Sequence, residues 1–193
     1  MSKTSEPLIE ISSPKGLVPL NLHELWEYRE LAVFMLWRDV KGRYRQMALG
    51  PLWMIINPIM NVVIFTVLFG MMAKFPSDGV PYPLFNYSAL LIWTFFTSSL
   101  YTASGSLVGY RDLISKVYFP RLTIPLVGIM SAIVDFLISF VLLVGVAAYF
   151  GYPPTWRLAF IPLYLLMASS IGLAVGLWFA SWIVHFRDVN ALL

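Results

Sequence analysis

Four long apolar runs constrain the fold of this chain more than any other feature of its sequence. They cover residues 51–72, 84–107, 123–150 and 158–184, and short connectors rich in proline, glycine or charge separate them. Each run has the roughly 20 residues that an α-helix needs to cross the hydrocarbon core of a bilayer. Their polar residues are too few to form one polar face of a soluble helix. The sequence therefore predicts an all-α, polytopic membrane protein with four transmembrane helices.

The composition agrees with this prediction. Hydrophobic residues make up 59% of the chain and charged residues only 12%, whereas charged residues are about 25% of a soluble domain. The mean hydropathy is +0.77. The absence of cysteine excludes disulfides and thiolate metal sites. Residues 1–20 lack the apolar core of a signal peptide, so we expect a flexible cytosolic tail followed by a membrane domain over residues 21–193.

The positions of lysine and arginine predict the orientation. If the N-terminus is cytosolic, 11 of the 13 basic residues fall on the cytosolic side, as the positive-inside rule favours. Only Lys74 and Arg157 then lie outside. The cytosolic set is Lys3, Lys15, Arg29, Arg38, Lys41, Arg43, Arg45, Arg111, Lys116, Arg121 and Arg187.

An amphipathic interface helix is expected over residues 22–45, ahead of the first apolar run. Its apolar residues recur at spacings of three and four, which predicts one apolar stripe. Its second half is basic and suited to anionic headgroups. Two interpretations stay open, a helix that only anchors the N-terminus and one that also contacts a cytosolic partner. The stripe consists of Leu22, Leu25, Trp26, Val33, Leu36, Trp37, Val40 and Tyr44, and the headgroup candidates are Arg38, Lys41, Arg43 and Arg45.

A second distinctive segment, GYRDLISKVYFPR, covers residues 109–121 between the second and third runs. Its apolar residues predict a short helix with one apolar edge, and Pro120 is expected to end that helix. The segment is either a capped membrane loop or an exposed helix suited to docking into a groove on another protein.

Several of these motifs together resemble one family. They are WRDVKGRYRQMALGPLW over residues 37–53, GYRDLISKVYFPRLTIPL over residues 109–126, VDF in the third run and HFRD after the fourth. The combination resembles the permease subunit of ABC exporters for surface polysaccharides, the O-antigen and teichoic-acid group. The resemblance implies an inner-membrane homodimer that works with two copies of a cytosolic ATP-binding subunit. It also implies a substrate glycan carried on undecaprenyl diphosphate.

The same resemblance implies roles for particular segments. Residues 22–45 correspond to the interface helix and residues 110–121 to the coupling helix that meets the ATPase. The chain contains no GxxxxGK[ST] phosphate loop, so we expect it to bind no cofactor and the partner to use ATP. The coupling candidates are Tyr110, Arg111, Asp112, Lys116, Tyr118, Phe119 and Arg121.

Members of this family usually continue for two further membrane helices, whereas this sequence stops at Leu193. The resemblance therefore covers the N-terminal two thirds of such a permease. A truncated gene, a fragment and a shorter subunit all stay open, and a non-transporting scaffold or a permease relic is the alternative function.

Within the runs, Asp135 is an acid near the middle of the third span, where it costs about 2.5–3.5 kcal/mol. It must pair, face water or be protonated, and it serves either packing and assembly or substrate and proton handling. Aromatic rings can stack on the apolar faces of sugars, which makes Trp53, Phe65 and Phe69 pore-lining candidates, although rings near span ends also form the interfacial belt. A small-residue face consisting of Ala168, Gly172, Gly176 and Ala180 predicts close helix packing, within one protomer or at a dimer seam.

Other classes of protein fit less well. A membrane enzyme would need more acids or histidines than His185 and Asp188 at the end of the fourth run. No metal site, catalytic residue or nucleic-acid partner is expected. A drug or lipid exporter of the same broad class stays a further alternative.

Overall fold

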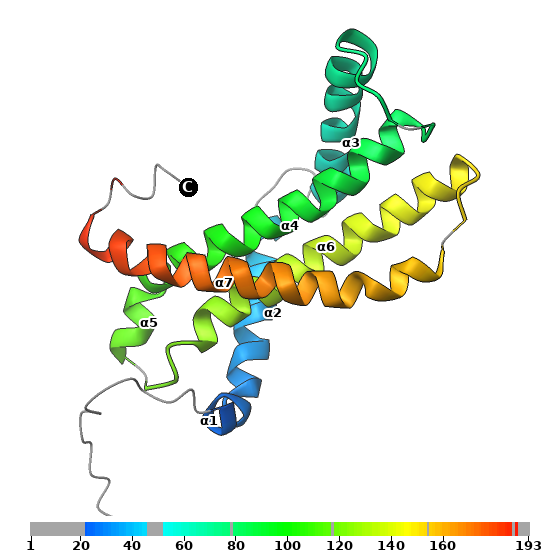
Figure 1. The fold of residues 1–193 in the computed structure, drawn as a ribbon. Coiled ribbons are helices and arrows are strands. Elements are labelled where there is room, and N and C mark those ends of the chain that lie inside the picture. Colours follow the sequence, from blue (N-terminus) through cyan, green and yellow to red (C-terminus); the bar gives the residue numbers. More distant parts are fainter. Residues whose placement is uncertain are drawn as a thin grey trace, which may run out of the picture.

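The structure is a computed structural model, and the part of the chain that it describes consists of helices and their connectors (Figure 1). The all-α prediction is confirmed. The predicted tail of residues 1–20 lies outside the described residues, which are 22–45, 52–77, 79–116, 118–153, 155–186 and 188. The elements are α1 (Leu22–Glu27), α2 (Arg29–Arg45), α3 (Trp53–Phe65), the π-helix η2 (Thr66–Met72), α4 (Tyr82–Gly109), α5 (Arg111–Lys116), α6 (Thr123–Tyr149), the 3₁₀-helix η3 (Trp156–Phe160) and α7 (Ile161–His185).

Three stretches of described residues are long and apolar enough to cross a membrane, namely Trp53–Met72, Thr123–Tyr149 and Trp156–His185. They coincide with the first, third and fourth predicted spans. Helix α4 has 28 residues, or about 42 Å at 1.5 Å per residue, so it is long enough but less apolar. Its crossing of the membrane, and with it the count of four spans, stays a prediction.

The polar residues of α4 are largely hydroxyls that bond to the helix itself. Thr94 Oγ1 donates to the carbonyl oxygens of Leu90, at 2.6 Å, and Leu91, at 3.1 Å. A hydroxyl bonded in this way is not left unpaired in an apolar environment. These hydroxyls are therefore compatible with a membrane span. The same bond, to a carbonyl three or four residues earlier, is made by Thr97, Thr102, Ser104 and Ser106.

Helix α4 is the centre of the fold, with α6 and α7 beside it (Figure 1). The small-residue face of α7 makes the close approach. A Cβ added at Gly176 would lie 2.5 Å from the Cβ of Ala103, and one added at Gly172 would lie 3.2 Å from the Cβ of Ser99. Gly172, Gly176 and Ala180 are all buried. The prediction of close packing is confirmed, and these glycines are used within one protomer.

The interface helix differs from its prediction in one respect. It is interrupted by a turn at Tyr28, so that α1 and α2 are separate helices. Trp26 and Trp37 of the predicted stripe are 67% and 68% exposed, as residues that face a membrane interface would be, and the stripe stays a prediction. Met35, outside that stripe, is buried against the fold, at 1% exposure. Helix α2 is apolar on two sides, and only the tertiary contacts decide which side packs.

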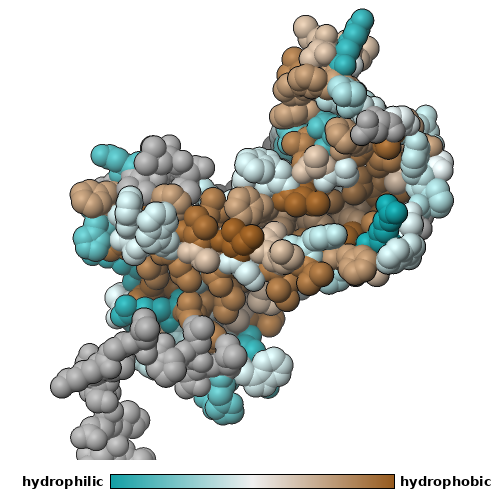
Figure 2. All heavy atoms as spheres, viewed as in Figure 1, coloured by the Kyte–Doolittle hydropathy of each residue, from teal (hydrophilic) through white to brown (hydrophobic). Residues whose placement is uncertain are grey.

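Helix α3 contributes no buried residue to the described fold. Pro58 lies inside it, and the chain continues into the π-helix η2. Hydrophobic side chains dominate the middle of the molecule, and hydrophilic ones gather toward its ends (Figure 2). Helices α1 and α5 lie at one end of the molecule, opposite the turns that follow η2 and α6, and α2 runs from α1 toward the middle (Figure 1). The surface of the molecule is therefore hydrophobic in the middle, where a bilayer would surround it, and more hydrophilic at its two ends.

Candidate functional site

An ion pair joins the interface helix to the middle of a membrane span. Arg43 Nη1 of α2 lies 2.5 Å from Asp135 Oδ2 of α6. Arg43 Nη2 donates a second hydrogen bond to the hydroxyl of Ser131, one turn earlier on α6. Both charged side chains are about one third exposed, at 35% and 31%. The guanidinium thus partly compensates a carboxylate that would otherwise be costly at this depth.

The two charged residues were predicted for different roles, Arg43 at the headgroups and Asp135 inside the membrane. They are 92 residues apart in the chain, so spacing gave no indication that they would meet. The requirement that an intramembrane acid find a partner was the available signal.

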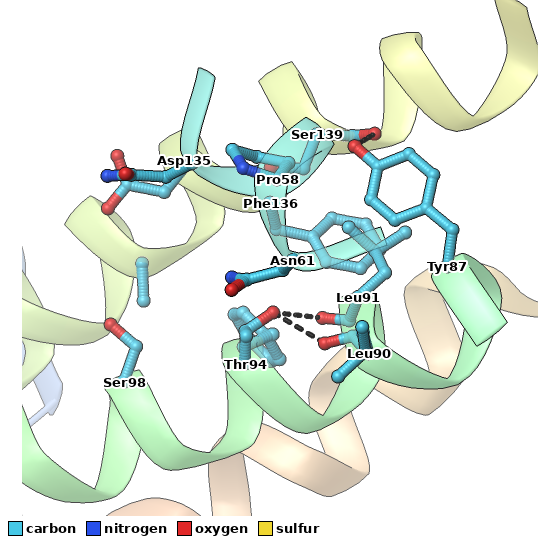
Figure 3. A pocket seen from close by; sticks show the side chains of 13 residues that line it. Pro58, Asn61, Tyr87, Leu90, Leu91, Thr94, Ser98, Asp135, Phe136 and Ser139 are labelled. Carbon is cyan, nitrogen blue, oxygen red and sulfur yellow. Dashed lines mark hydrogen bonds between the residues drawn. The ribbon is translucent and has the colours of Figure 1, made fainter. Parts of the chain in front are cut away.

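Asp135 also lines a polar cavity between α3, α4 and α6. The cavity has a volume of about 230 Å³. Figure 3 shows Asn61 of α3, Thr94 of α4 and Asp135 of α6 around the same space. Tyr87 closes one side by donating from its hydroxyl to the carbonyl oxygen of Ser139, at 2.9 Å. The lining residues are Asn57, Pro58, Asn61, Tyr87, Leu90, Leu91, Thr94, Phe95, Ser98, Ala132, Asp135, Phe136 and Ser139.

A second and larger cavity, of about 550 Å³, lies beside α2. Arg43 and Ser131 line it, together with Arg38, Asp39 and Tyr110. Because Asp135 lines the first cavity and its partner Arg43 lines the second, the ion pair lies between the two. The other lining residues are Gly42, Tyr101, Thr102, Gly105, Ser106, Ile124 and Gly128.

Arg38, Asp39 and Tyr110 form a network at the edge of this second cavity. Arg38 Nη2 lies 3.3 Å from Asp39 Oδ1, and its guanidinium carbon lies 4.9 Å from the centre of the Tyr110 ring. The Tyr110 hydroxyl donates to Asp39 Oδ2. Burial, followed by this bond to a carboxylate, raises the pKa of Tyr110 to about 12. The network ties α2 to the start of the 110–121 segment.

The 110–121 segment has an outward and an inward side. Helix α5 begins with Arg111 and Asp112 and ends at Lys116, and these three residues are exposed, as is Arg121. Tyr118 is 81% exposed, whereas the adjacent Phe119 is only 5% exposed. Phe119 packs with Met35 of α2 and with Ile124 and Val127 of α6. Of the seven coupling candidates, five face outward, and Tyr110 and Phe119 join the segment to α2.

The remaining predicted site residues lie apart from the two cavities. Lys41 is exposed on α2, and Arg45 is the last residue of that helix, with its side chain outside the described residues. Phe65 stacks on Phe69 with ring centres 5.6 Å apart. Neither ring lines either polar cavity, and neither does Trp53. The polar residues Asn57 and Asn61 of the same helix are the ones that do. No group of three metal-ligating side chains occurs in the part of the chain that the structure describes.

Apolar helices of span length that pack closely through glycine define a polytopic membrane protein. The family model described as ABC-2 type transporter matches residues 30–193. The chain belongs to this family of membrane transport proteins.

Curated relatives agree with the family. The chain is 29% identical over 170 residues to the O-antigen export system permease protein RfbA of Myxococcus xanthus, covering 88% of this chain and 64% of the relative. It is 27% identical over 162 residues to the protein of the same name from Klebsiella pneumoniae, covering 83% of this chain and 62% of the relative. The chain thus spans less than two thirds of the length of these relatives. The family resemblance in the sequence is confirmed.

Proposed function

We propose that this chain is the permease subunit of an ATP-driven exporter that moves an undecaprenyl-diphosphate-linked polysaccharide across the inner membrane. It works as a homodimer with a cytosolic ATP-binding subunit, and its N-terminus is cytosolic. Membership of the ABC-2 family supports the transport role. The names of the relatives support an O-antigen-like cargo. The lack of a phosphate loop in these 193 residues supports a separate ATPase.

The two-sided 110–121 segment is the observation that carries this proposal. The exposed side chains of Asp112, Lys116 and Tyr118 form the surface that the ATPase contacts. Phe119 and Tyr110, on the other side, transmit a displacement of the segment to α2 through Met35 and Asp39. A short exposed helix with a packed base is suited to docking into a groove on another protein.

Motion of α2 then acts on the ion pair. Arg43 moves with α2, and Asp135 stays on α6, so a shift of α2 separates the guanidinium from the carboxylate. Because this pair lies between the two cavities, its separation connects the cytosolic cavity with the polar cavity inside the membrane. Closure of the ATPase is thereby coupled to opening of a polar path.

The basic residues of α2 receive the diphosphate of the substrate at the inner surface. Arg38 and Lys41 are available there, with Arg43 and Arg45 further along the same helix. Asn57 and Asn61 of α3 offer amides to sugar hydroxyls in the polar cavity. The rings of Trp53, Phe65 and Phe69 form the apolar part of the conduit.

Cysteine cross-linking tests the docking surface. The chain has no native cysteine, so Tyr118→Cys introduces a unique thiol on the outward side of the 110–121 segment. Tyr149→Cys is the matched control, because Tyr149 is 86% exposed and lies at the opposite end of α6. With a cross-linker that carries a maleimide for the new thiol and a benzophenone that inserts into C–H bonds of a neighbour on irradiation, Tyr118→Cys in native membranes is expected to yield an adduct with a subunit that carries a phosphate loop. If neither variant, or both equally, captures such a subunit, this segment is not the docking surface.

A deletion strain tests the cargo. Loss of the chain is expected to reduce surface polysaccharide and to accumulate the lipid-linked glycan on the cytosolic leaflet, and re-expression reverses both effects. Unchanged surface polysaccharide would exclude the export role and favour a non-transporting scaffold.

A further inference from the structure

A third cavity, unrelated to the polar pair, lies between α4, α6 and α7. It has a volume of about 230 Å³ and apolar walls. Phe95, Phe136 and Phe140 form its floor, with ring centres 5.5 and 5.9 Å apart. The single charged residue of its lining is Arg157 of η3. We call this cavity the aromatic groove.

The length of the aromatic groove matches one leaflet of a bilayer. Along η3 and α7 its lining extends from Arg157 to Ala168, which is about 18 Å at roughly 2.0 Å per residue in the 3₁₀-helix and 1.5 Å per residue in α7. Half of a hydrocarbon core is about 15 Å. The groove thus begins at the end of the span that is opposite α1 and α5, and it reaches the middle of the membrane.

The charge at its mouth has no partner within the described chain. Arg157 is exposed, and no described residue forms a hydrogen bond or ion pair with its guanidinium. Trp156 and Phe160 lie edge to face beside it, with ring centres 5.6 Å apart, as aromatic residues do at the headgroup level. An anion at headgroup depth would complete this site.

We propose that the aromatic groove binds one phospholipid, with an acyl chain along Phe95, Phe136 and Phe140 and the phosphate on Arg157. The cavity is too small for a helix, whose diameter with side chains is about 10–12 Å. An apolar protein surface laid over the mouth would bury Arg157 without a counter-charge, which is strongly unfavourable. A phospholipid supplies both the chain and the anion at the required separation.

Native mass spectrometry of the full chain in detergent tests this site. The probes are phosphatidylglycerol and the uncharged diacylglycerol with the same two acyl chains. We expect wild type to bind phosphatidylglycerol at least five-fold more tightly than diacylglycerol. Arg157→Gln removes this preference, because the neutral amide cannot pair with the phosphate. Lys74→Gln, which neutralises another exposed basic residue outside the groove lining, leaves the preference intact.

A blocking variant tests the acyl-chain half of the site. Ile92 lines the groove and is 52% exposed, so Ile92→Trp narrows the groove without disturbing the core. It is expected to weaken binding of both lipids at least five-fold. Ile171→Trp is the control, because Ile171 is 53% exposed on α7 and lies outside the lining. Equal binding by wild type and all variants, or no lipid retained by wild type, would overturn the proposal.

Discussion

The ion pair between Arg43 and Asp135 makes a quantitative prediction about stability. At an effective dielectric constant of about 20, two unit charges roughly 4 Å apart attract by about 4 kcal/mol. Each side chain is about one third exposed, and screening by solvent reduces this value to roughly 2 kcal/mol. Removing one partner also leaves the other charge in a membrane environment. We therefore expect Arg43→Met and Asp135→Asn each to destabilise the protein by about 2 kcal/mol.

A double-mutant cycle separates the pair from its surroundings. The free energies of unfolding of wild type, both single variants and Arg43→Met/Asp135→Asn are measured by denaturation in mixed micelles. The double variant is expected to lose at least about 1 kcal/mol less than the sum of the two single losses, because the second substitution removes an already unpaired group. Lys41→Met is the control, since Lys41 is exposed on the same helix. Additive losses would refute the idea that the two residues stabilise each other.

Three further predictions concern the packing of Phe119, the hydrogen bond of Tyr110 and the contact between α4 and α7. Phe119→Ala should lower the free energy of unfolding by about 3 kcal/mol because Phe119 is 5% exposed, whereas Tyr118→Ala should leave it nearly unchanged and weaken binding of the ATPase instead. The fold raises the pKa of Tyr110 from 10 to about 12, so the stability contributed by the protonated phenol is fully present below pH 10 and is lost as the pH rises from 10 to 12. The free energy of unfolding should therefore fall by roughly 1 kcal/mol over this pH range after solvent screening. Tyr110→Phe should not show this fall. Gly176→Val should separate α4 from α7 and cost about 1–3 kcal/mol in the same unfolding assay, because an added Cβ meets the Cβ of Ala103 at 2.5 Å, while Gly105→Ala, with nothing within 4 Å, should be tolerated.

The class of fold could be predicted because apolar runs of span length leave few alternatives. The small-residue face of α7 was equally informative, since Gly172 and Gly176 permit a close approach that larger residues forbid. Whether α4 crosses the membrane is harder to decide from hydropathy. Its many hydroxyls lower its hydropathy, yet most of them, such as those of Thr94 and Thr97, bond to carbonyl oxygens of the same helix, and a mean hydropathy does not take such bonds into account.

The details of the site needed tertiary structure. Periodicity over residues 22–45 predicted one apolar stripe that includes Trp26 and Trp37, whereas Met35, outside that stripe, packs against the fold, because α2 presents apolar residues on two sides. Tyr118 and Phe119 are adjacent aromatic residues that point to opposite sides, and neither composition nor spacing distinguishes them. The partner of Asp135 lies on a helix 92 residues away in sequence. Only the packing of α2 against α6 brings them together.

A measurement of ATP-dependent glycan movement across a membrane tests the central claim, that this chain is the permease of a polysaccharide exporter, most directly. The chain, with the ATP-binding subunit that purifies with it, is reconstituted into liposomes that carry a lipid-linked glycan, and accessible glycan is removed with an added glycosidase. The account predicts that ATP, but not a non-hydrolysable analogue, moves glycan into the protected compartment, and that Arg43→Met reduces this movement. Glycan that stays equally accessible with and without ATP would contradict the account.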